Sequence, residues 1–404
     1  MNHNFDLTQA SGVPTQPIPG LRVSVLVPTF NRANYITECI DSLLAQTMAA
    51  LEVIVIDDGS EDRTAELLRN YGDRIRYVRK ENGGKPTAVN LGLTLAQGEL
   101  IWIFDDDDVA LPQAIANRVM ALQAMPSAGF VYTPHFYGRD GQDGKIIKGR
   151  LHPLSIHRQD TFLYELMKGC FFHLATALVR AEAYRAVGGF DTELLSSEDY
   201  DMQLRLAQAF PAAYSPAPSF IFRQHTGLRG AKIIRHSENQ RSRVFRKFDH
   251  RIGQKLRARL NLGDYLSPRQ TVISTSTAQR QALLARMIVM ASKGCMPEMM
   301  EDLRALLALL PPDEVPADCQ LEAITEAICT GHAALAITDQ WEHFQELISE
   351  LPRSRAGRTV RRSVATGLFR LSRGYPGSIQ LRCLRLAQAC RVAINGLFAK
   401  PSGL

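Results

Sequence analysis

The fold class is predicted most directly from residues 100–108, which read LIWIFDDDD. The five apolar residues predict a buried strand, and the four carboxylates after it repel one another. Alternation at the tip of a strand sends Asp105 and Asp107 to one side and Asp106 and Asp108 to the other. Two carboxylates on one side of a strand end suit a hard divalent cation, Mn²⁺ or Mg²⁺. The alternative is a solvated acidic turn that binds nothing.

The flanking segments alternate between strand and helix patterns. Strands are predicted at 21–27, 51–56, 74–78 and 129–133, and helices at 34–46, 62–70, 87–96 and 112–125. Alternation with short connections predicts an α/β fold with a mostly parallel sheet. Polar clusters fall at the ends of three strands: 28–32, 57–60 and 105–108. Because ligand sites lie at the carboxyl ends of such strands, we expect the clusters to face one crevice.

Several spaced motifs resemble the family 2 glycosyltransferases, inverting nucleotide-sugar transferases with the GT-A fold. The motifs are VSVLVPTFNRANYITECIDSLLAQTMAALEVIVIDDGS at 23–60, NGGKPTAVN at 82–90, the acid run with Pro112, GGFD at 188–191 and EDYD at 198–201. The resemblance extends over residues 21–226 and implies a GT-A (Rossmann-like) sheet with helices on both faces. The Gln-x-x-Arg-Trp motif of processive members is absent from the sequence, which indicates addition of a single sugar.

The resemblance assigns most of these polar residues to a nucleotide-sugar donor. Asp105 and Asp107 are implied as the Asp-x-Asp pair on the metal, with His225 as a third metal contact. The residues implied to bind the donor or its nucleotide are Pro28, Thr29, Asn31, Arg32, Asp57, Asp58, Lys85, Asp105 and Asp106. The structural alternatives are a helix cap for Asn31, a tight turn at Asp58-Gly59, and ordinary surface positions for Lys85 and His225.

A pair of acids opens a predicted helix at residue 198. An inverting displacement requires the acceptor hydroxyl to lose its proton as it attacks, so one carboxylate acts as general base. The resemblance implies Asp199 as this base and Glu198 as its neighbour on the acceptor side. Acids in a first helical turn also stabilise the helix dipole, and both interpretations can hold together.

Composition divides the 404 residues into four parts. Residues 1–20 are polar and expected to be a disordered lead-in, and 21–230 form the predicted GT-A domain. Residues 231–270 are basic and expected to be a linker or flexible loop. Residues 271–404 show helical patterns and predict an all-helical accessory domain with a basic end. The net charge is +6, yet residues 352–404 hold 11 Lys and Arg and no acid.

The basic C-terminal block has two interpretations. Apolar faces flanked by arginines at 360–372 and 380–397 suit either an anionic membrane or packing within the domain with solvated arginines. No apolar run approaches the roughly 18 residues that span a bilayer, and the N-terminus lacks a signal-peptide pattern. Seven scattered cysteines argue against disulfides and zinc. We therefore expect a cytoplasmic protein, with peripheral contact at the inner face of the cell membrane as an open alternative.

The expected function is a metal-dependent, inverting hexosyl transfer. The donor is expected to be a UDP-sugar and the acceptor a saccharide or lipid-linked saccharide, in bacterial-type polysaccharide or glycoconjugate synthesis for the cell envelope. One alternative is a sugar nucleotidylyltransferase, which the absence of a glycine-rich loop after the first predicted strand disfavours. The other is a non-catalytic module that binds anionic lipid or nucleic acid. The intact acids disfavour it, and no nucleic acid is expected.

Overall fold

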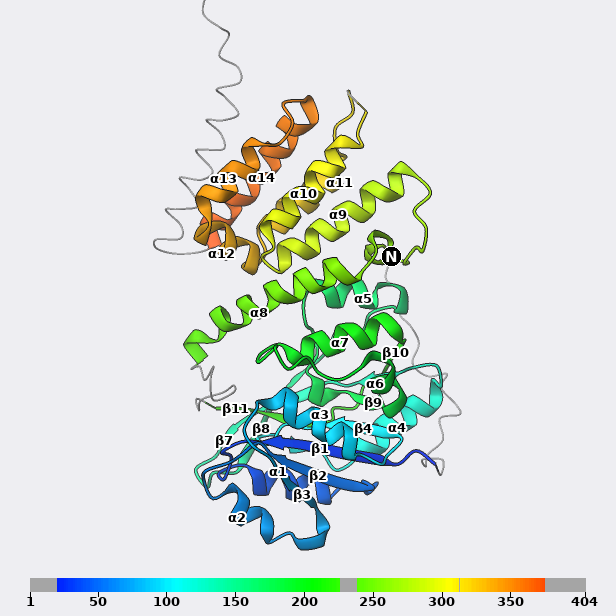
Figure 1. Ribbon diagram of the computed structural model, residues 1–404, viewed down its shortest axis with the longest axis vertical. Coiled ribbons are helices and arrows are strands. Elements are labelled where there is room, and N and C mark those ends of the chain that lie inside the picture. The colour runs from blue at the N-terminus through cyan, green and yellow to red at the C-terminus, as the bar shows by residue number, and fades with distance from the viewer. Residues whose placement is uncertain (1–19, 226–237, 312, 375–404) are drawn as a thin grey trace, which may run out of the picture. The chain divides into compact units, whose positions relative to one another are not determined.

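The computed structural model describes residues 20–225, 238–311 and 313–374. The chain divides into two compact units (Figure 1). The α/β unit comprises residues up to Leu163 and Cys170–Arg241, and the helical unit comprises Tyr164–Gly169 and the residues from Ser242 onward. Most of the predicted lead-in and the predicted helix at 380–397 lie outside the described residues.

The α/β unit is built on a seven-stranded sheet in the order β10-β6-β9-β4-β1-β2-β3. The strands are β1 (Val23–Thr29), β2 (Glu52–Asp57), β3 (Arg76–Arg79), β4 (Leu100–Ile103), β6 (Phe130–Tyr132), β9 (Leu178–Arg180) and β10 (Ala212–Tyr214). All neighbouring pairs are parallel except those that β9 makes with β4 and β6. The predicted mostly parallel α/β fold is confirmed.

Helices cover both faces of this sheet. They are α1 (Ile36–Leu44), α2 (Thr64–Arg69), α3 (Lys85–Leu95), α4 (Ala114–Ala124), α5 (Gln159–Lys168), α6 (Ala181–Val187) and α7 (Glu198–Ala209). On β1, Val25 and Val27 belong to the buried cluster that also contains residues of α1 and α4. Leu26 points the other way and lies against Gly92 of α3, where a Cβ atom would stand 3.2 Å from it. Burial on both faces explains the unbroken apolar run in this strand.

A second sheet of four strands has the order β5-β11-β7-β8 and was not predicted. Its strands are β5 (Val109–Ala110), β7 (His135–Asp140), β8 (Ile146–His152) and β11 (Phe220–Gln224). β8 is largely exposed, so it lacks the apolar alternation that reveals a half-buried strand. β5 follows the four acids directly and pairs with β11, which brings the end of β11 to those acids.

The helical unit contains the helices from α8 onward. These are α8 (Glu238–Arg259), α9 (Ser276–Ser292), α10 (Met296–Ala308), α11 (Asp318–Ile328), α12 (Gly331–Asp339), α13 (Trp341–Ser349) and α14 (Arg355–Gly374). A helical domain at the C-terminal side is confirmed. Among the described residues, no helix is both long and apolar enough to cross a bilayer.

The expected linker at 231–270 is wrong where the structure describes it, because α8 occupies much of that range. Phe248, Ile252 and Leu256 recur every four residues and are buried, so the basic composition hides an amphipathic helix. On the apolar face at 360–372, Val360, Val364 and Leu368 are buried, which favours packing within the protein for these side chains. Peripheral contact with an anionic membrane stays a prediction.

Candidate active site

The four carboxylates after β4 form a turn, here called the acid turn (Asp105–Asp108). β4 ends at Ile103, and the amide of Asp108 donates to the carbonyl of Asp105 at 3.3 Å. The expected strand-like alternation of the four side chains is therefore wrong. Asp106 and Asp107 both face the guanidinium group of Arg32. Its Nε lies 3.3 Å from Asp106 Oδ1, and its Nη2 lies 4.0 Å from Asp107 Oδ2.

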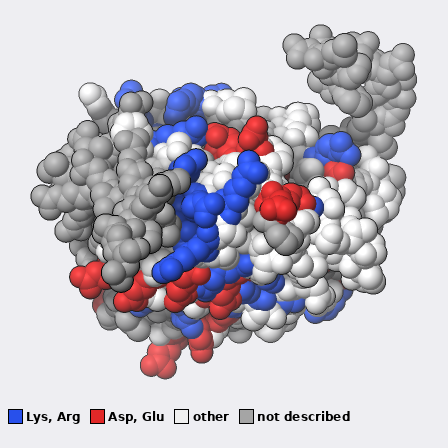
Figure 2. Space-filling model, turned by 90° about the horizontal axis from the view of Figure 1, so that it is seen from above, with Lys and Arg blue, Asp and Glu red and all other residues white. Residues whose placement is uncertain are grey.

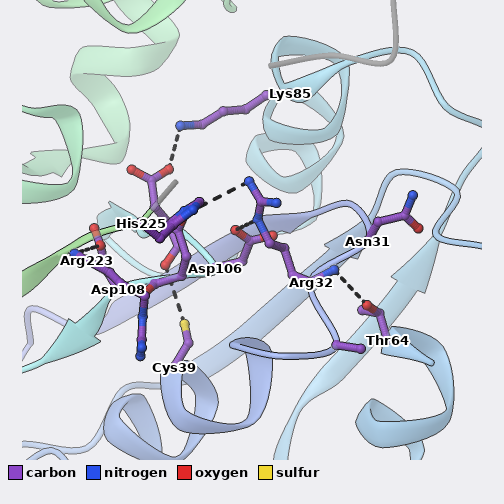
Figure 3. A network of polar contacts seen from close by, with 12 residues as sticks. Asn31, Arg32, Cys39, Thr64, Lys85, Asp106, Asp108, Arg223 and His225 are labelled. Atoms are coloured by element: carbon purple, nitrogen blue, oxygen red, sulfur yellow. Dashed lines mark hydrogen bonds and ion pairs between the residues drawn. The ribbon is translucent and has the colours of Figure 1, made fainter. Parts of the chain in front are cut away.

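Three cationic or titratable side chains surround the acid turn (Figure 3). Besides Arg32, Lys85 Nζ lies 2.5 Å from Asp105 Oδ1. His225 Nε2 lies 2.9 Å from Asp107 Oδ2, and its ring contacts that of Tyr35 at 5.2 Å between centroids. The structure thus brings together residues that the sequence separates by more than 100 positions.

Arg223 holds the acid turn through hydrogen bonds and was not among the predicted site residues. Its side chain is fully buried, its amide donates to Asp108 Oδ1 at 2.9 Å, and its Nε donates to the carbonyl of Asp107 at 2.7 Å. The remaining guanidinium nitrogens pair with Asp140 at 2.5 Å and with Glu38. The signal in the sequence was an arginine within the apolar run FIFR at 220–223, because a buried arginine is usually paired.

The loop after β1 is tied to the loop after β2. Asn31 has a left-handed backbone with φ 54°, and its Oδ1 accepts from the amides of Glu61 and Asp62 at 2.8 and 3.3 Å. In Figure 3 its side chain lies apart from the Arg32–Asp106 contact. Asn31 therefore braces two loops rather than capping the following helix. Its contact with a nucleotide stays a prediction.

Asp57 and Asp58 are buried at the end of β2, and their carboxylate oxygens interact with other groups of the protein. Asp57 accepts from the amide of Ser60 at 2.7 Å and from the hydroxyl of Tyr77 at 2.6 Å. Asp58 pairs with Lys80 at 2.6 Å. It also accepts from the amides of Gly83 and Gly84 at 3.0 and 2.7 Å. The pair shapes the loop that leads to Lys85, and its role toward a nucleobase stays a prediction.

Pro28 and Thr29 are the last residues of β1 and lie inside the sheet. They pair in register with Ile56 and Asp57, and both are buried. The carbonyl of Thr29 accepts from the amide of Asp58 at 2.9 Å. They position the strand end, and direct contact with a donor stays a prediction.

The N-terminus of α7 places Glu198 and Asp199 beside this cluster. Burial, together with the charge of Asp199, raises the pKa of Glu198 to about 7, although Lys85 opposes the shift. Burial alone lowers the pKa of Lys85, but nearby carboxylates outweigh it and raise that pKa above its usual value; they are Asp105, Glu198 and Asp199. One lysine is thus coupled electrostatically to both carboxylate groups.

Backbone strain coincides with these positions. Among the described residues, the non-glycine residues with positive φ are Asn31 and Ser197. Asparagine tolerates this conformation, whereas for serine it costs roughly 1–2 kcal/mol. Ser197 precedes Glu198 directly, so the strained residue sets the direction in which the helix presents its acids. Strain of this kind persists where the surrounding structure fixes it, often at functional sites.

The donor atoms at the acid turn suit a divalent cation. Burial raises the pKa of Asp106 to about 6, with Arg32 opposing the shift and Asp107 adding to it, so negative charge there is incompletely offset. Asp107 and His225 present a carboxylate and an imidazole side by side, a ligand set that Mn²⁺ accepts. No group of three or more His, Cys, Asp or Glu side chains in the described part of the chain has metal-binding geometry. A site with so few protein ligands leaves positions for phosphate oxygens, as is usual for Mg²⁺.

Solved structures establish the class of fold. The crystal structure of S. aureus TarS matches with a TM-score of 0.51 and 17% identity, over 81% of this chain and 55% of that chain. A TarS fragment in complex with UDP-GlcNAc matches with a TM-score of 0.50 and 16% identity, over 81% and 91% of the two chains. At this identity the likeness concerns the fold alone, which is the GT-A fold.

One segment of the sequence matches a known family. Residues 24–188 match Glycosyl transferase family 2, as the motifs indicated. An uncharacterized glycosyltransferase of Rickettsia felis is 29% identical over 266 residues, which cover 64% of this chain and 44% of that protein. The chondroitin synthase of Pasteurella multocida is 32% identical over 189 residues, covering 46% of this chain and 19% of that protein. The chain thus spans less than half the length of either relative.

Proposed function

We propose that this chain is a metal-dependent, inverting glycosyltransferase that moves a single hexose from a UDP-sugar to a saccharide or lipid-linked saccharide. The observation that carries the proposal is the position of Lys85. It pairs with Asp105 of the acid turn, and the charges of Glu198 and Asp199 act with that of Asp105 in raising the pKa of Lys85, so donor-side and acceptor-side acids act on one cation. Lys85 and Asp105 lie within residues 24–188, the segment that matches Glycosyl transferase family 2, and Glu198 and Asp199 follow that segment.

The donor side consists of the acid turn and its cations. Asp107 and His225, with Asp105, would hold Mn²⁺ or Mg²⁺, which supplies charge neutralisation for the departing diphosphate. Arg32 and Lys85 carry N–H groups that could donate hydrogen bonds to diphosphate oxygens in place of the carboxylates of the acid turn. A UDP-sugar is favoured because a structure of similar fold was solved with UDP-GlcNAc.

The acceptor side consists of the two acids at the start of α7. Asp199 would accept the proton of the acceptor hydroxyl while that oxygen attacks the anomeric carbon and the bond to the diphosphate breaks. Glu198 exchanges a proton near pH 7, so the charge of the pair changes in the working range of most enzymes. The Pasteurella relatives, a chondroitin synthase and a hyaluronan synthase by name, support a saccharide acceptor in polysaccharide synthesis.

The test is release of UDP from a panel of UDP-sugars, with Mn²⁺, Mg²⁺ or EDTA. We expect slow hydrolysis of one donor with metal, and faster release when its acceptor is added. Pyrophosphate release from a nucleoside triphosphate and a sugar phosphate would instead support a nucleotidylyltransferase. No reaction and no binding with any donor would contradict both enzyme assignments.

A further inference from the structure

Five arginines gather where α13 ends and α14 begins. This arginine patch consists of Arg353, Arg355, Arg358, Arg361 and Arg362. Arg361 is 6% exposed, and the other four are exposed or half-exposed. Figure 2 shows a face of the molecule on which Lys and Arg side chains form a band. The patch lies in the helical unit, far along the chain from the residues of the candidate active site.

The charges of the patch are not neutralised by acids. No carboxylate of the described residues lies within ion-pair distance of any of its five guanidinium groups. Arg358 and Arg361 donate instead to backbone carbonyls, those of Arg353 at 2.6 Å and Pro352 at 3.2 Å. Burial, and then the charges of Arg353 and Arg358, lower the pKa of Arg361. The patch is therefore a concentration of positive charge.

The arginine patch lies at the N-terminus of α14, where a concentration of positive charge is unfavourable unless an anion offsets it. The N-terminus of a helix carries partial positive charge and favours acids, yet α14 has no acid in its first turn. Ser354 supplies an ordinary cap, with its Oγ accepting from the amide of Gly357 at 3.2 Å. Arg355 and Arg358 add positive charge to the same end. An external anion would relieve both the mutual repulsion and the unfavourable dipole interaction.

We propose that the arginine patch binds the anionic surface of a lipid membrane. Exposed guanidinium groups suit a surface with many negative charges, whereas a discrete phosphate site would need converging donors, and the inward Arg361 is already bonded to carbonyls. Single-stranded nucleic acid sites add aromatic stacking side chains, and residues 352–363 contain none. The rest of the chain continues the charge, since residues 375–404 hold four Lys and Arg and no acid.

Binding through the patch is electrostatic and salt-dependent. The apolar face of α14 is buried, so no apolar side chains of this helix insert into the bilayer. Each exposed basic residue near an anionic surface contributes about a fivefold increase in affinity, screened by salt. The interaction does not depend on donor chemistry, and its failure would leave the proposed glycosyl transfer untouched.

The experiment is co-sedimentation of the full chain with vesicles of phosphatidylcholine alone or mixed with phosphatidylglycerol, at 50 and 500 mM NaCl. We expect binding only to the anionic vesicles at low salt. Arg355→Gln with Arg362→Gln should weaken it about 25-fold, the product of two fivefold effects. The matched control is Arg304→Gln with Arg370→Gln, which removes the same charge from arginines paired with Glu350 and Glu322. This control should bind within a fewfold of the original protein.

Three results would overturn the proposal. The full chain could fail to sediment with anionic vesicles at low salt. The control pair could lose as much binding as the patch pair, or the patch pair could lose none, which would place binding elsewhere, including in residues 375–404. Inorganic phosphate at 5 mM could displace the protein when NaCl of equal ionic strength does not, which would indicate a discrete phosphate site.

Discussion

Lys85 Nζ lies 2.5 Å from Asp105 Oδ1, which joins the start of α3 to the acid turn after β4. Both side chains keep about a third of their surface exposed, 37% and 32%, so a ligand can reach the pair. The same ammonium group is coupled to Glu198 and Asp199. A reaction that builds negative charge at the acid turn and removes a proton at α7 would thus change the electrostatic interactions of Lys85 on both sides.

Asp199→Asn should separate chemistry from binding. The amide keeps the shape of the side chain but cannot accept a proton, so kcat should fall about 10²–10⁴-fold while donor affinity is retained. The measurement is steady-state transfer together with donor titration. The control is Glu182→Gln, which removes an exposed acid from the first turn of α6 and tests the helix-dipole alternative. Lost donor binding at unchanged turnover would move Asp199 to the donor site.

Glu198→Gln should stabilise the protein at alkaline pH. The pKa of Glu198 is raised to about 7 from an ordinary 4.5, so the folded protein holds a proton that the unfolded chain has released. The resulting stability is fully present below about pH 4.5 and is lost as pH rises through about 7. The neutral glutamine lacks this loss and should add up to about 3 kcal/mol to the free energy of unfolding at pH 8. Denaturant unfolding at pH 4.5 and 8 measures it; identical differences at both pH values would contradict the burial argument.

Arg223→Met should destabilise the α/β unit strongly. It removes a fully buried guanidinium and leaves Glu38 and Asp140, whose side chains are 27% and 37% exposed, without this partner, so the loss should lie between that of an exposed pair, about 1 kcal/mol, and that of a fully buried pair, about 3–5 kcal/mol. Arg22→Met is the control, because the exposed Arg22–Glu99 pair should contribute no more than about 1 kcal/mol. Denaturant unfolding of both variants checks the difference. Equal stabilities would show that Arg223 does not hold the acid turn.

His135 should make the protein sensitive to acid. Burial, followed by the charges of His173 and His152, lowers the pKa of His135 to about 3. Below an ordinary pKa of 6.5 the unfolded chain gains a proton that the folded protein refuses, so stability falls as pH drops from about 6.5 toward 3. Tyr137 is the other titratable ring in contact with His135.

His135→Phe should remove this sensitivity, since a phenyl ring can keep the stacking on Phe220, whose centroid lies 5.3 Å away. The variant should gain about 3 kcal/mol relative to the original protein at pH 4, and less at pH 7. His343→Gln, at an exposed position, should show no such pH-dependent gain. Parallel pH–stability curves for His135→Phe and the original protein would refute the assignment.

The sheet was predictable because its central strands are apolar on both faces. The patterns at 21–27, 51–56 and 100–104 correspond to β1, β2 and β4 within one or two residues. The side chains of the acid turn were not predictable by the same rule. Alternation applies only while the backbone remains extended, and β4 ends at Ile103, two residues before Asp105.

The second sheet and the role of Arg223 were not predicted, for a different physical reason. Arg223 and Glu38 are 185 residues apart, and they meet because β11 pairs with β5 and β7 in the second sheet. β5 has only two residues, and β8, which pairs with β7, is largely exposed. No local sequence pattern therefore predicts this sheet. Pairing between such strands is decided by tertiary packing, which a single sequence does not display.

Asp107 and His225 are proposed to bind the donor through a divalent cation. The most direct measurement is calorimetric titration of the UDP-sugar active in the release assay, with Mn²⁺ and with EDTA. The original protein and an Asp73→Asn control, altered at an exposed acid, should bind the donor at least tenfold more tightly with Mn²⁺. Asp107→Asn should lose that difference while it remains folded. Equal affinity with and without Mn²⁺ in the original protein, or an undiminished Mn²⁺ effect in Asp107→Asn, would contradict the claim.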